Sequence, residues 1–140
     1  MENMVGDWTL VPELTTGHDE FAEAVGMSDE EREMTRNFSY TFHLSRDGDE
    51  WRMKIDIAKM GTLMDTKFKT GVPFTYMSPD QVTKLTDVIT VRNGHLMEKM
   101  TSEKGGLIRQ WDVDTYREGD FLVVVQTKDG KSKTQKLRHQ

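Results

Sequence analysis

The feature that most constrains this chain is a series of short strand patterns separated by turns, which begins at residue 37 and runs almost to the end of the sequence. Residues 37–45 alternate between apolar and polar side chains, and after an Asp-Gly turn residues 50–58 do the same. Such a pair predicts a β-hairpin. Further strand patterns follow at residues 61–69, 72–77, 81–91, 95–102, 107–116, 121–127 and 132–138.

Another strand pattern lies near the N-terminus, where residues 5–14 surround Trp8, so the expected number of strands is ten. Pro73 and Pro79 do not change this number, because proline is tolerated at a strand start and in a turn. Successive antiparallel strands remove their exposed edges most simply by closing into a barrel. We therefore predict one all-β domain over residues 1–140, built as a ten-stranded antiparallel up-and-down β-barrel. Trp8 is expected to pack at its closed end.

A helical pattern interrupts the strands directly after the first of them. Phe21, Ala22 and Val25 have helical spacing and predict a short helix over residues 18–25. Gly26 is expected to end this helix, and Thr16 with Asp19 three residues later offers a start signal.

A second helical pattern follows at once. Ser28 with Glu31 three residues later is typical of a capping box at a helix start. A barrel of ten strands is too wide to be filled by side chains alone, so a binding cavity is expected inside it. Because two short helices cannot fill that space, we expect residues 16–36 to form a lid over one open end.

Charge and composition exclude several classes of protein. The net charge is −5, with 19 Lys and Arg against 24 Asp and Glu, which argues against nucleic-acid binding. The chain has no cysteine, so disulfides and thiolate chemistry are excluded. Residues 1–8 lack the pattern of a signal peptide, and no apolar run of about 18 residues occurs, so we expect a cytoplasmic location. Apolar residues make up only 35% of the chain, which indicates a thin core or a partly polar interior.

The sequence offers no recognisable catalytic or metal site. Its histidines, His18, His43, His95 and His139, are far apart and form no metal-binding spacing. A cysteine nucleophile, a G-x-S-x-G elbow and a phosphate loop are also absent from the sequence. We therefore expect a protein that is not an enzyme and that needs no cofactor or metal.

Six segments together resemble the landmarks of the intracellular fatty-acid-binding and retinoid-binding protein family. They are VGDWTL at Val5, HDEFAEAVGM at His18, EREMTR at Glu31, DGDEW at Asp47, FKTGVPF at Phe68 and REGDFLVV at Arg117. The resemblance implies a β-clam, the ten-stranded barrel of that family, capped by a helix-turn-helix. It also implies a monomeric cytoplasmic carrier of a fatty acid or another hydrophobic small molecule, with transient membrane contact through the lid helices.

The resemblance also implies where a ligand carboxylate would bind. The family holds it with two inward arginines and a tyrosine, the first arginine and the tyrosine lying on the last strand, where this chain has Lys136, Leu137 and Arg138. The second arginine falls on Thr115, although a shift in register would give Arg109 that role instead. Gln126 is a further hydrogen-bonding candidate. The expected head-group residues are thus Lys136, Arg138, Thr115, Gln126 and Arg109.

The hydrocarbon part of the ligand is expected to contact apolar and aromatic side chains of the strands, and the lid is expected to line the portal. The residues expected to do so are His18, Phe21, Val25, Tyr40, Ile55, Ile57, Met64 and Val124.

Three alternatives stay open at this stage. Lys136 and Arg138 can instead belong to a solvated basic tail, with Leu137 pointing inward. The barrel can carry a retinoid, or it can act without a lipid as a protective or protein-interaction module. The identity and number of ligands and the receiving partner are not determined by the sequence.

Overall fold

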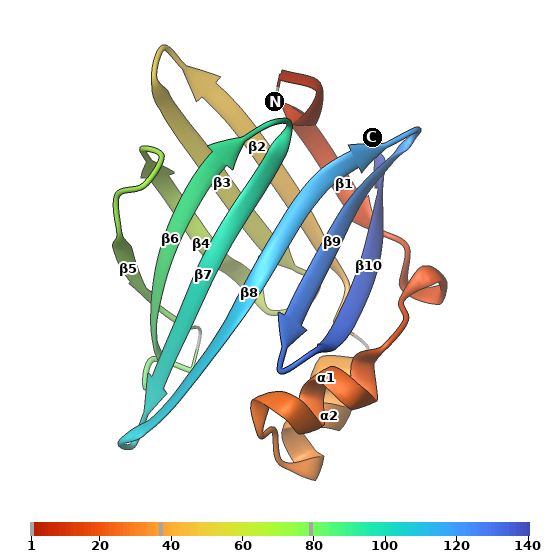
Figure 1. Cartoon of the computed structure of the whole chain (residues 1–140), viewed down its shortest axis with the longest axis vertical. Helices are drawn as coiled ribbons and strands as arrows, with labels where there is room; N and C mark the ends of the chain where they lie inside the picture. Colours follow the sequence, from red (N-terminus) through yellow and green to blue (C-terminus); the bar gives the residue numbers. More distant parts are fainter. Residues whose placement is uncertain (1, 37, 79) are drawn as a thin grey trace.

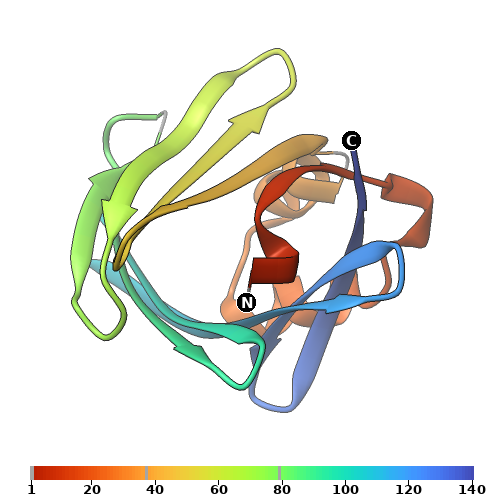
Figure 2. The same cartoon turned by 90° about the horizontal axis from the view of Figure 1, so that it is seen from above.

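Ten antiparallel strands of the computed structural model form one sheet that curls into a nearly closed barrel (Figures 1 and 2). The structure describes residues 2–36, 38–78 and 80–140, so Asn37 and Pro79, which were expected in a strand and a turn, lie outside the described residues. The strands are β1 (Gly6–Leu10), β2 (Tyr40–Asp47), β3 (Glu50–Ile57), β4 (Gly61–Phe68), β5 (Phe74–Met77), β6 (Lys84–Arg92), β7 (His95–Lys104), β8 (Leu107–Glu118), β9 (Phe121–Lys128) and β10 (Lys131–His139). The predicted number of strands and their antiparallel arrangement are confirmed.

The order of the strands explains how the sheet closes. Strands that are consecutive in sequence are hydrogen-bonded neighbours in the sheet, except β4 and β5, and β1 also pairs with β10. β4 and β5 form the two ends of the hydrogen-bonded order. The rings of Phe68 on β4 and Phe74 on β5 stack across this seam with their centroids 6.0 Å apart. Aromatic packing thus joins the two edge strands.

The turns follow the glycine and asparagine signals of the sequence. Between β6 and β7, Asn93 and Gly94 have φ angles of 52° and 78°, the left-handed conformations that a tight two-residue hairpin turn needs. Because side chains alternate along each strand, these turns also determine which residues face the interior.

The N-terminal strand is shorter than predicted. β1 ends at Leu10, and Pro12–Leu14 form a 3-10 helix instead of continuing the strand. Pro12 has no backbone N–H to donate to a ladder, which accounts for the end of the strand at this point. The segment beyond it leads to the lid.

The lid consists of α1 (His18–Val25) and α2 (Asp29–Arg36), and it covers the end of the barrel where β10 begins (Figure 1). The predicted capping box is confirmed, since the backbone N–H of Ser28 donates to Glu31 Oε1 and that of Glu31 donates to Ser28 Oγ, both at 3.1 Å. Gly26 ends α1, as predicted. No described helix is long and apolar enough to cross a membrane.

The start of α1 differs from the prediction. Its N-cap is Gly17 in the left-handed conformation, and Thr16 makes no side-chain cap bond. A Cβ at Gly17 would collide with the carbonyl oxygen of Ser132 on β10. The residue before α1 is therefore a glycine because the lid approaches β10 closely there. Thr16 does not cap the helix and instead pairs through its backbone with Thr134 on β10.

A group of completely buried residues lies at the opposite end of the barrel, where the N-terminal segment lies over the opening (Figure 2). Trp8 is completely buried there, as expected, and its Nε1 donates to the carbonyl of Met4 at 2.9 Å. Leu122 and Leu137 from β9 and β10 are also completely buried in this cluster. We call this region the closed end.

Candidate ligand-binding site

The inner wall of the barrel brings together the strand residues that were expected to contact a hydrocarbon chain. Tyr40 pairs with Ile57, and Ile55 pairs with Met64, on the inward face of β2, β3 and β4. Val124 lies on the inward face of β9, and it packs against the same core cluster as Tyr40 and Ile55. These five side chains thus line one interior.

Several inward side chains of the barrel are only partly buried. Tyr40, Ile55, Phe74, Tyr76 and Val124 point inward and pack against the core, yet each keeps part of its surface accessible. In a solid core such inward residues would be covered by their neighbours, because protein interiors are close-packed. The inner wall between the closed end and the lid therefore offers apolar surface to a small molecule.

Polar inward side chains form lateral rows across the sheet. In one row Thr115, Val124 and Gln135 are successive partners on β8, β9 and β10. The hydroxyl of Tyr40 donates to Gln135 Oε1 at 2.9 Å, so this row reaches across to β2. The next row contains Glu98, Val113, Gln126 and Lys133, from β7 to β10. Thr115 and Gln126, both predicted site residues, thus lie on the inner wall.

Lys136 and Arg138 do not join them. Leu137 is completely buried on the inward face of β10, so its two neighbours point outward. The cationic groups of Lys136 and Arg138 lie over the ring of Phe121 on the outer face, at 5.7 and 5.5 Å from its centroid. This geometry does not support a position of Lys136 and Arg138 beside a ligand head group in the interior, because side chains alternate strictly along β10.

Lys133 is the inward cation of β10, and the sequence interpretation did not identify it. Its side chain is only 7% exposed, and burial lowers its pKa to about 8, because the charged form is less well solvated inside the protein. The alternation of Lys133, Gln135 and Leu137 was the available signal. It was missed because the resemblance placed the head-group cation at Lys136, three residues further along and on the opposite face of the strand.

Arg109 holds the lid to the barrel. From β8 it donates to both carboxylate oxygens of Glu31, at 2.7 and 3.1 Å, and to the carbonyl of Gly26 at 2.9 Å. These bonds join the rim of the barrel to the end of α1 and the first turn of α2. The guanidinium of Arg109 lowers the pKa of Glu31 to about 2. Arg109 is therefore engaged by the lid and does not lie free in the interior.

The three lid residues predicted at the portal lie on the buried side of α1. His18, Phe21 and Val25 are 8%, 3% and 8% exposed, and α1 packs mainly on β10. His18 Nε2 must carry the ring proton, because its partner at 2.9 Å is the carbonyl oxygen of Arg32 on α2. His18 thereby ties the two lid helices together.

A pair of interior carboxyl groups, Asp87 on β6 and Glu98 on β7, was not expected from the sequence. Asp87 is completely buried, and Glu98 pairs with the buried Ile89 on the inward face. Burial raises the pKa of Asp87, and burial together with the neighbouring Asp87 raises the pKa of Glu98 well above its ordinary value. We call these two residues the acid pair. Their alternation with Leu85 and Ile89, and with Leu96 and Met100, was the signal that could have revealed them.

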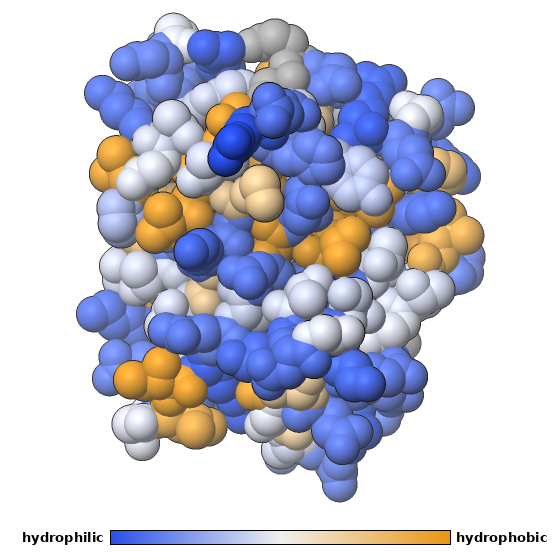
Figure 3. All heavy atoms as spheres, in the orientation of Figure 1, coloured by the Kyte–Doolittle hydropathy of each residue, from blue (hydrophilic) through white to orange (hydrophobic). Residues whose placement is uncertain are grey.

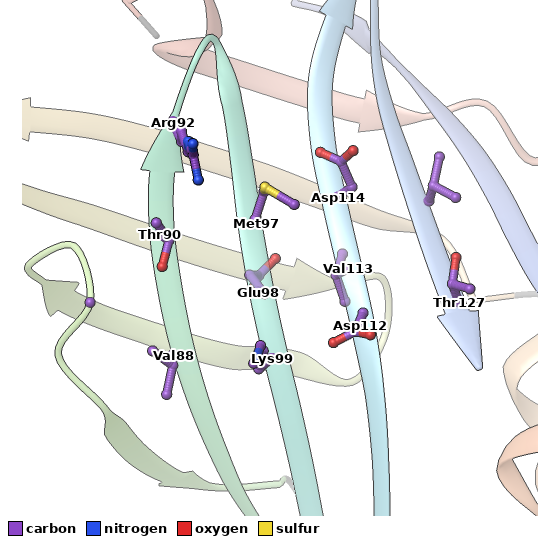
Figure 4. A pocket seen from close by; sticks show the side chains of 12 residues that line it. Val88, Thr90, Arg92, Met97, Glu98, Lys99, Asp112, Val113, Asp114 and Thr127 are labelled. Atoms are coloured by element: carbon purple, nitrogen blue, oxygen red, sulfur yellow. The ribbon is translucent and has the colours of Figure 1, made fainter. Parts of the chain in front are cut away.

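A groove of about 580 Å³ lies on the outer wall of β6 to β9 (Figure 4). Its lining includes Thr90, Met97, Lys99, Asp112 and Asp114, which alternate with inward residues. Apolar and polar residues are mixed over this face of the molecule (Figure 3). Glu98 and Val113 also line the groove, although alternation along β7 and β8 places both on the inward face, so the groove adjoins the part of the wall that bears the acid pair.

Comparison with known proteins identifies the fold. No family model and no curated protein matches the sequence. Among solved structures, the REP1-NXSQ fatty acid transporter matches with a TM-score of 0.79 at 18% identity, covering 100% of this chain and 98% of its own. The fatty-acid-binding protein 1 of Echinococcus granulosus gives 0.76 at 21% identity, over 99% and 98%. The Schistosoma mansoni fatty acid binding protein in complex with arachidonic acid gives 0.79 at 17% identity, over 100% and 98%. The predicted β-clam with a helix-turn-helix cap is confirmed.

Proposed function

We propose that this chain, with the fold of fatty-acid-binding proteins, binds a long-chain fatty acid or a similar hydrophobic molecule inside its barrel and carries it without catalysing a reaction. The observation that carries the proposal is the inner wall, where Tyr40, Ile55 and Val124 keep accessible surface although they point inward. Burial of a hydrocarbon chain there gains about 0.8 kcal/mol per CH₂ group. The structural neighbours named as a fatty acid transporter and as fatty acid binding proteins support this choice.

The lid is proposed to control entry and exit. Arg109 holds it through Glu31 and Gly26, and these contacts lie at the barrel rim, where they can break without unfolding the strands. Met34, Leu107 and Ile108 expose apolar side chains on α2 and at the tip of the β7–β8 hairpin, which supports transient membrane contact at this end. A single domain, a monomeric state and a cytoplasmic location remain predictions from the sequence.

A second function is favoured by the outer groove. Its mixed lining suits a protein partner, so the barrel can serve as a protective or interaction module without a ligand inside. A retinoid in place of a fatty acid remains within the first proposal, because both are long and apolar. The two functions differ in where the bound molecule lies.

Binding of a fluorescent fatty-acid analogue tests this difference. Val124→Trp fills part of the interior, whereas Val125→Trp adds the same side chain on the outer face beside the groove. We expect only the Val124 variant to lose affinity, on the order of tenfold, because overpacking costs about 1 to 3 kcal/mol. Equal effects of both variants, or failure of long-chain acids, alcohols, amines and retinoids to displace the analogue, would contradict binding in the interior. Native mass spectrometry of the purified protein would show any retained ligand directly.

A further inference from the structure

The acid pair is the feature of the interior that a simple fatty-acid carrier does not explain. Asp87 is completely buried, and neither of its carboxyl oxygens has a hydrogen-bond partner of good geometry among the described residues. A buried polar group without a partner is costly, so each such group in a folded protein needs an explanation. Two neighbouring carboxyl groups in one interior make this cost larger.

The position of the acid pair connects it to the proposed ligand space. Asp87 lies between its strand partners Phe74 on β5 and Met100 on β7. Glu98 is one diagonal step away, opposite Ile89, and it keeps part of its surface accessible. A molecule along the inner wall would therefore meet Glu98 first, with Asp87 behind it.

Other polar groups of the interior surround the same point. The charge of Glu98 contributes to raising the pKa of both Tyr40 and Tyr76, after the larger effect of burial. These hydroxyls therefore lie within electrostatic reach of Glu98, on β2 and β5. Tyr76 is also a strand neighbour of Asp87, because it pairs with Leu85 two residues away on β6, so the acid pair lies in a polar site that can accept several hydrogen bonds from one head group.

The interior cations lie elsewhere. Lys133 shares a lateral row with Glu98, but two strands separate them, which is a distance of about 14 Å along the sheet at the usual spacing. Arg109 is bound to Glu31 and Gly26 of the lid. Neither cation is placed to pair with the acid pair. The two carboxyl groups interact with each other, and a cationic partner for them would come from a ligand.

We propose that the acid pair, Asp87 and Glu98, selects a long-chain amphiphile with a hydrogen-bond-donating cationic head, namely a long-chain amine or amino alcohol, over one with a free carboxylate. An ammonium group has three donors and no acceptor, so it matches the unpartnered oxygens of Asp87 and the accessible carboxyl of Glu98. A carboxylate placed there adds a third acid to the interior and offers nothing to donate. This assignment rests on the proposed function, because it needs the ligand to enter the barrel.

Three ligands of equal chain length separate the alternatives: dodecylamine, dodecanol and dodecanoate, each titrated by calorimetry below its aggregation concentration. We expect dodecylamine to bind more tightly than dodecanoate by on the order of tenfold, as one charge-assisted hydrogen bond provides. Dodecanoate binding as tightly as dodecylamine overturns the assignment while leaving the carrier function intact. If none of the three ligands binds, both proposals fail.

Matched variants locate the selectivity. Asp87→Asn and Glu98→Gln keep the side-chain volume, and each should reduce dodecylamine affinity about tenfold while changing that of dodecanol less. Asp112→Asn removes the same charge from the outer face of β8 and should change neither, which controls for attraction of an amine to an acidic protein. Lys133→Met should weaken dodecanoate alone. Equal losses for Asp87→Asn and Asp112→Asn would overturn the assignment, and melting temperatures would show that each variant is folded.

Discussion

The two ends of the barrel are built in different ways. At the closed end, Trp8, Leu122 and Leu137 are completely buried and apolar packing dominates. At the lid end, Lys133 is buried with a lowered pKa, and Arg109 joins the barrel to the lid through hydrogen bonds that are partly exposed. We therefore expect stability to be concentrated at the closed end, whereas the contacts at the lid end can open. This division suits a carrier whose ligand must enter and leave.

The largest effect is expected from Trp8→Ala at the closed end. Removal of a completely buried indole leaves a cavity and should lower the free energy of unfolding by about 3 to 5 kcal/mol, measured by urea denaturation. Trp111→Ala is the matched control, because Trp111 points inward on β8 closer to the lid and is only half-buried. A loss at Trp111 as large as that at Trp8 would contradict the proposed concentration of stability.

In contrast to Trp8→Ala, Lys133→Met at the lid end is expected to raise the free energy of unfolding. Burial lowers the folded-state pKa of Lys133 from 10.5 to about 8, so the charged side chain destabilises the fold at pH 7. The variant should be more stable there by about 1 to 3 kcal/mol. Its advantage should shrink as the pH rises from 8 towards 10.5, since the unfolded chain then binds protons that the folded chain has released. Denaturation curves at both ends of this range measure the difference.

Lys136→Met is the control for that experiment. Lys136 lies on the outer face of the same strand, over Phe121, so its loss should change stability by no more than about 0.5 kcal/mol at any of these pH values. The same variant should leave the affinity for a carboxylate ligand unchanged. A pH dependence equal to that of Lys133→Met would show that the two lysines do not differ in burial.

Only a small effect on global stability is expected from Arg109→Met. Loss of its bonds to Glu31 and Gly26 should cost less than about 1 kcal/mol overall, because the ion pair is partly exposed. Amide hydrogen exchange should nevertheless become faster in α1 and α2 while the strands stay protected. Arg52→Met, which removes an ion pair with Asp65 on the outer face of β3 and β4, should leave exchange in the lid unchanged.

Lowering the pH tests the contact between Arg109 and Glu31 independently. The pKa of Glu31 is lowered from 4.5 to about 2, chiefly by Arg109, so its stabilising effect is complete above about pH 4.5 and is lost as the pH falls towards 2. Protection of the lid amides should decline over that range in the natural chain. The decline should be weaker in Arg109→Met; an identical decline would mean that another group controls the lid.

Much of the fold could be read from the sequence because its signals are local. Alternation and turn residues predicted the ten strands, helical spacing predicted α1, and Ser28 with Glu31 predicted the start of α2. The early end of β1 was missed, although Pro12 signals it. In each case neighbouring residues carry the information, since periodicity and capping act over a few positions.

The candidate site was predicted less completely, because it depends on register and on contacts between distant segments. On β10 the faces alternate with every residue, so Lys136 points outward whereas Lys133, three positions earlier, points inward. The resemblance gave the approximate position of the head-group cation on β10, but it did not determine which lysine faces the interior. Thr115 and Gln126 were placed on the inner wall by the same alternation, and their contact with a ligand remains a prediction.

By itself, the sequence determined the number of strands, the position of the lid in the chain and the acidic charge of the protein, because these follow from composition and local periodicity. Only the tertiary structure decided that Arg109 binds Glu31 of the lid and that Asp87 and Glu98 share the interior. Such pairs join residues that lie far apart in the chain or on different strands. Packing of the lid against β8 brings Arg109 to Glu31, and the pairing of β6 with β7 places Asp87 and Glu98 on one inward face, where burial sets the energy of their charges.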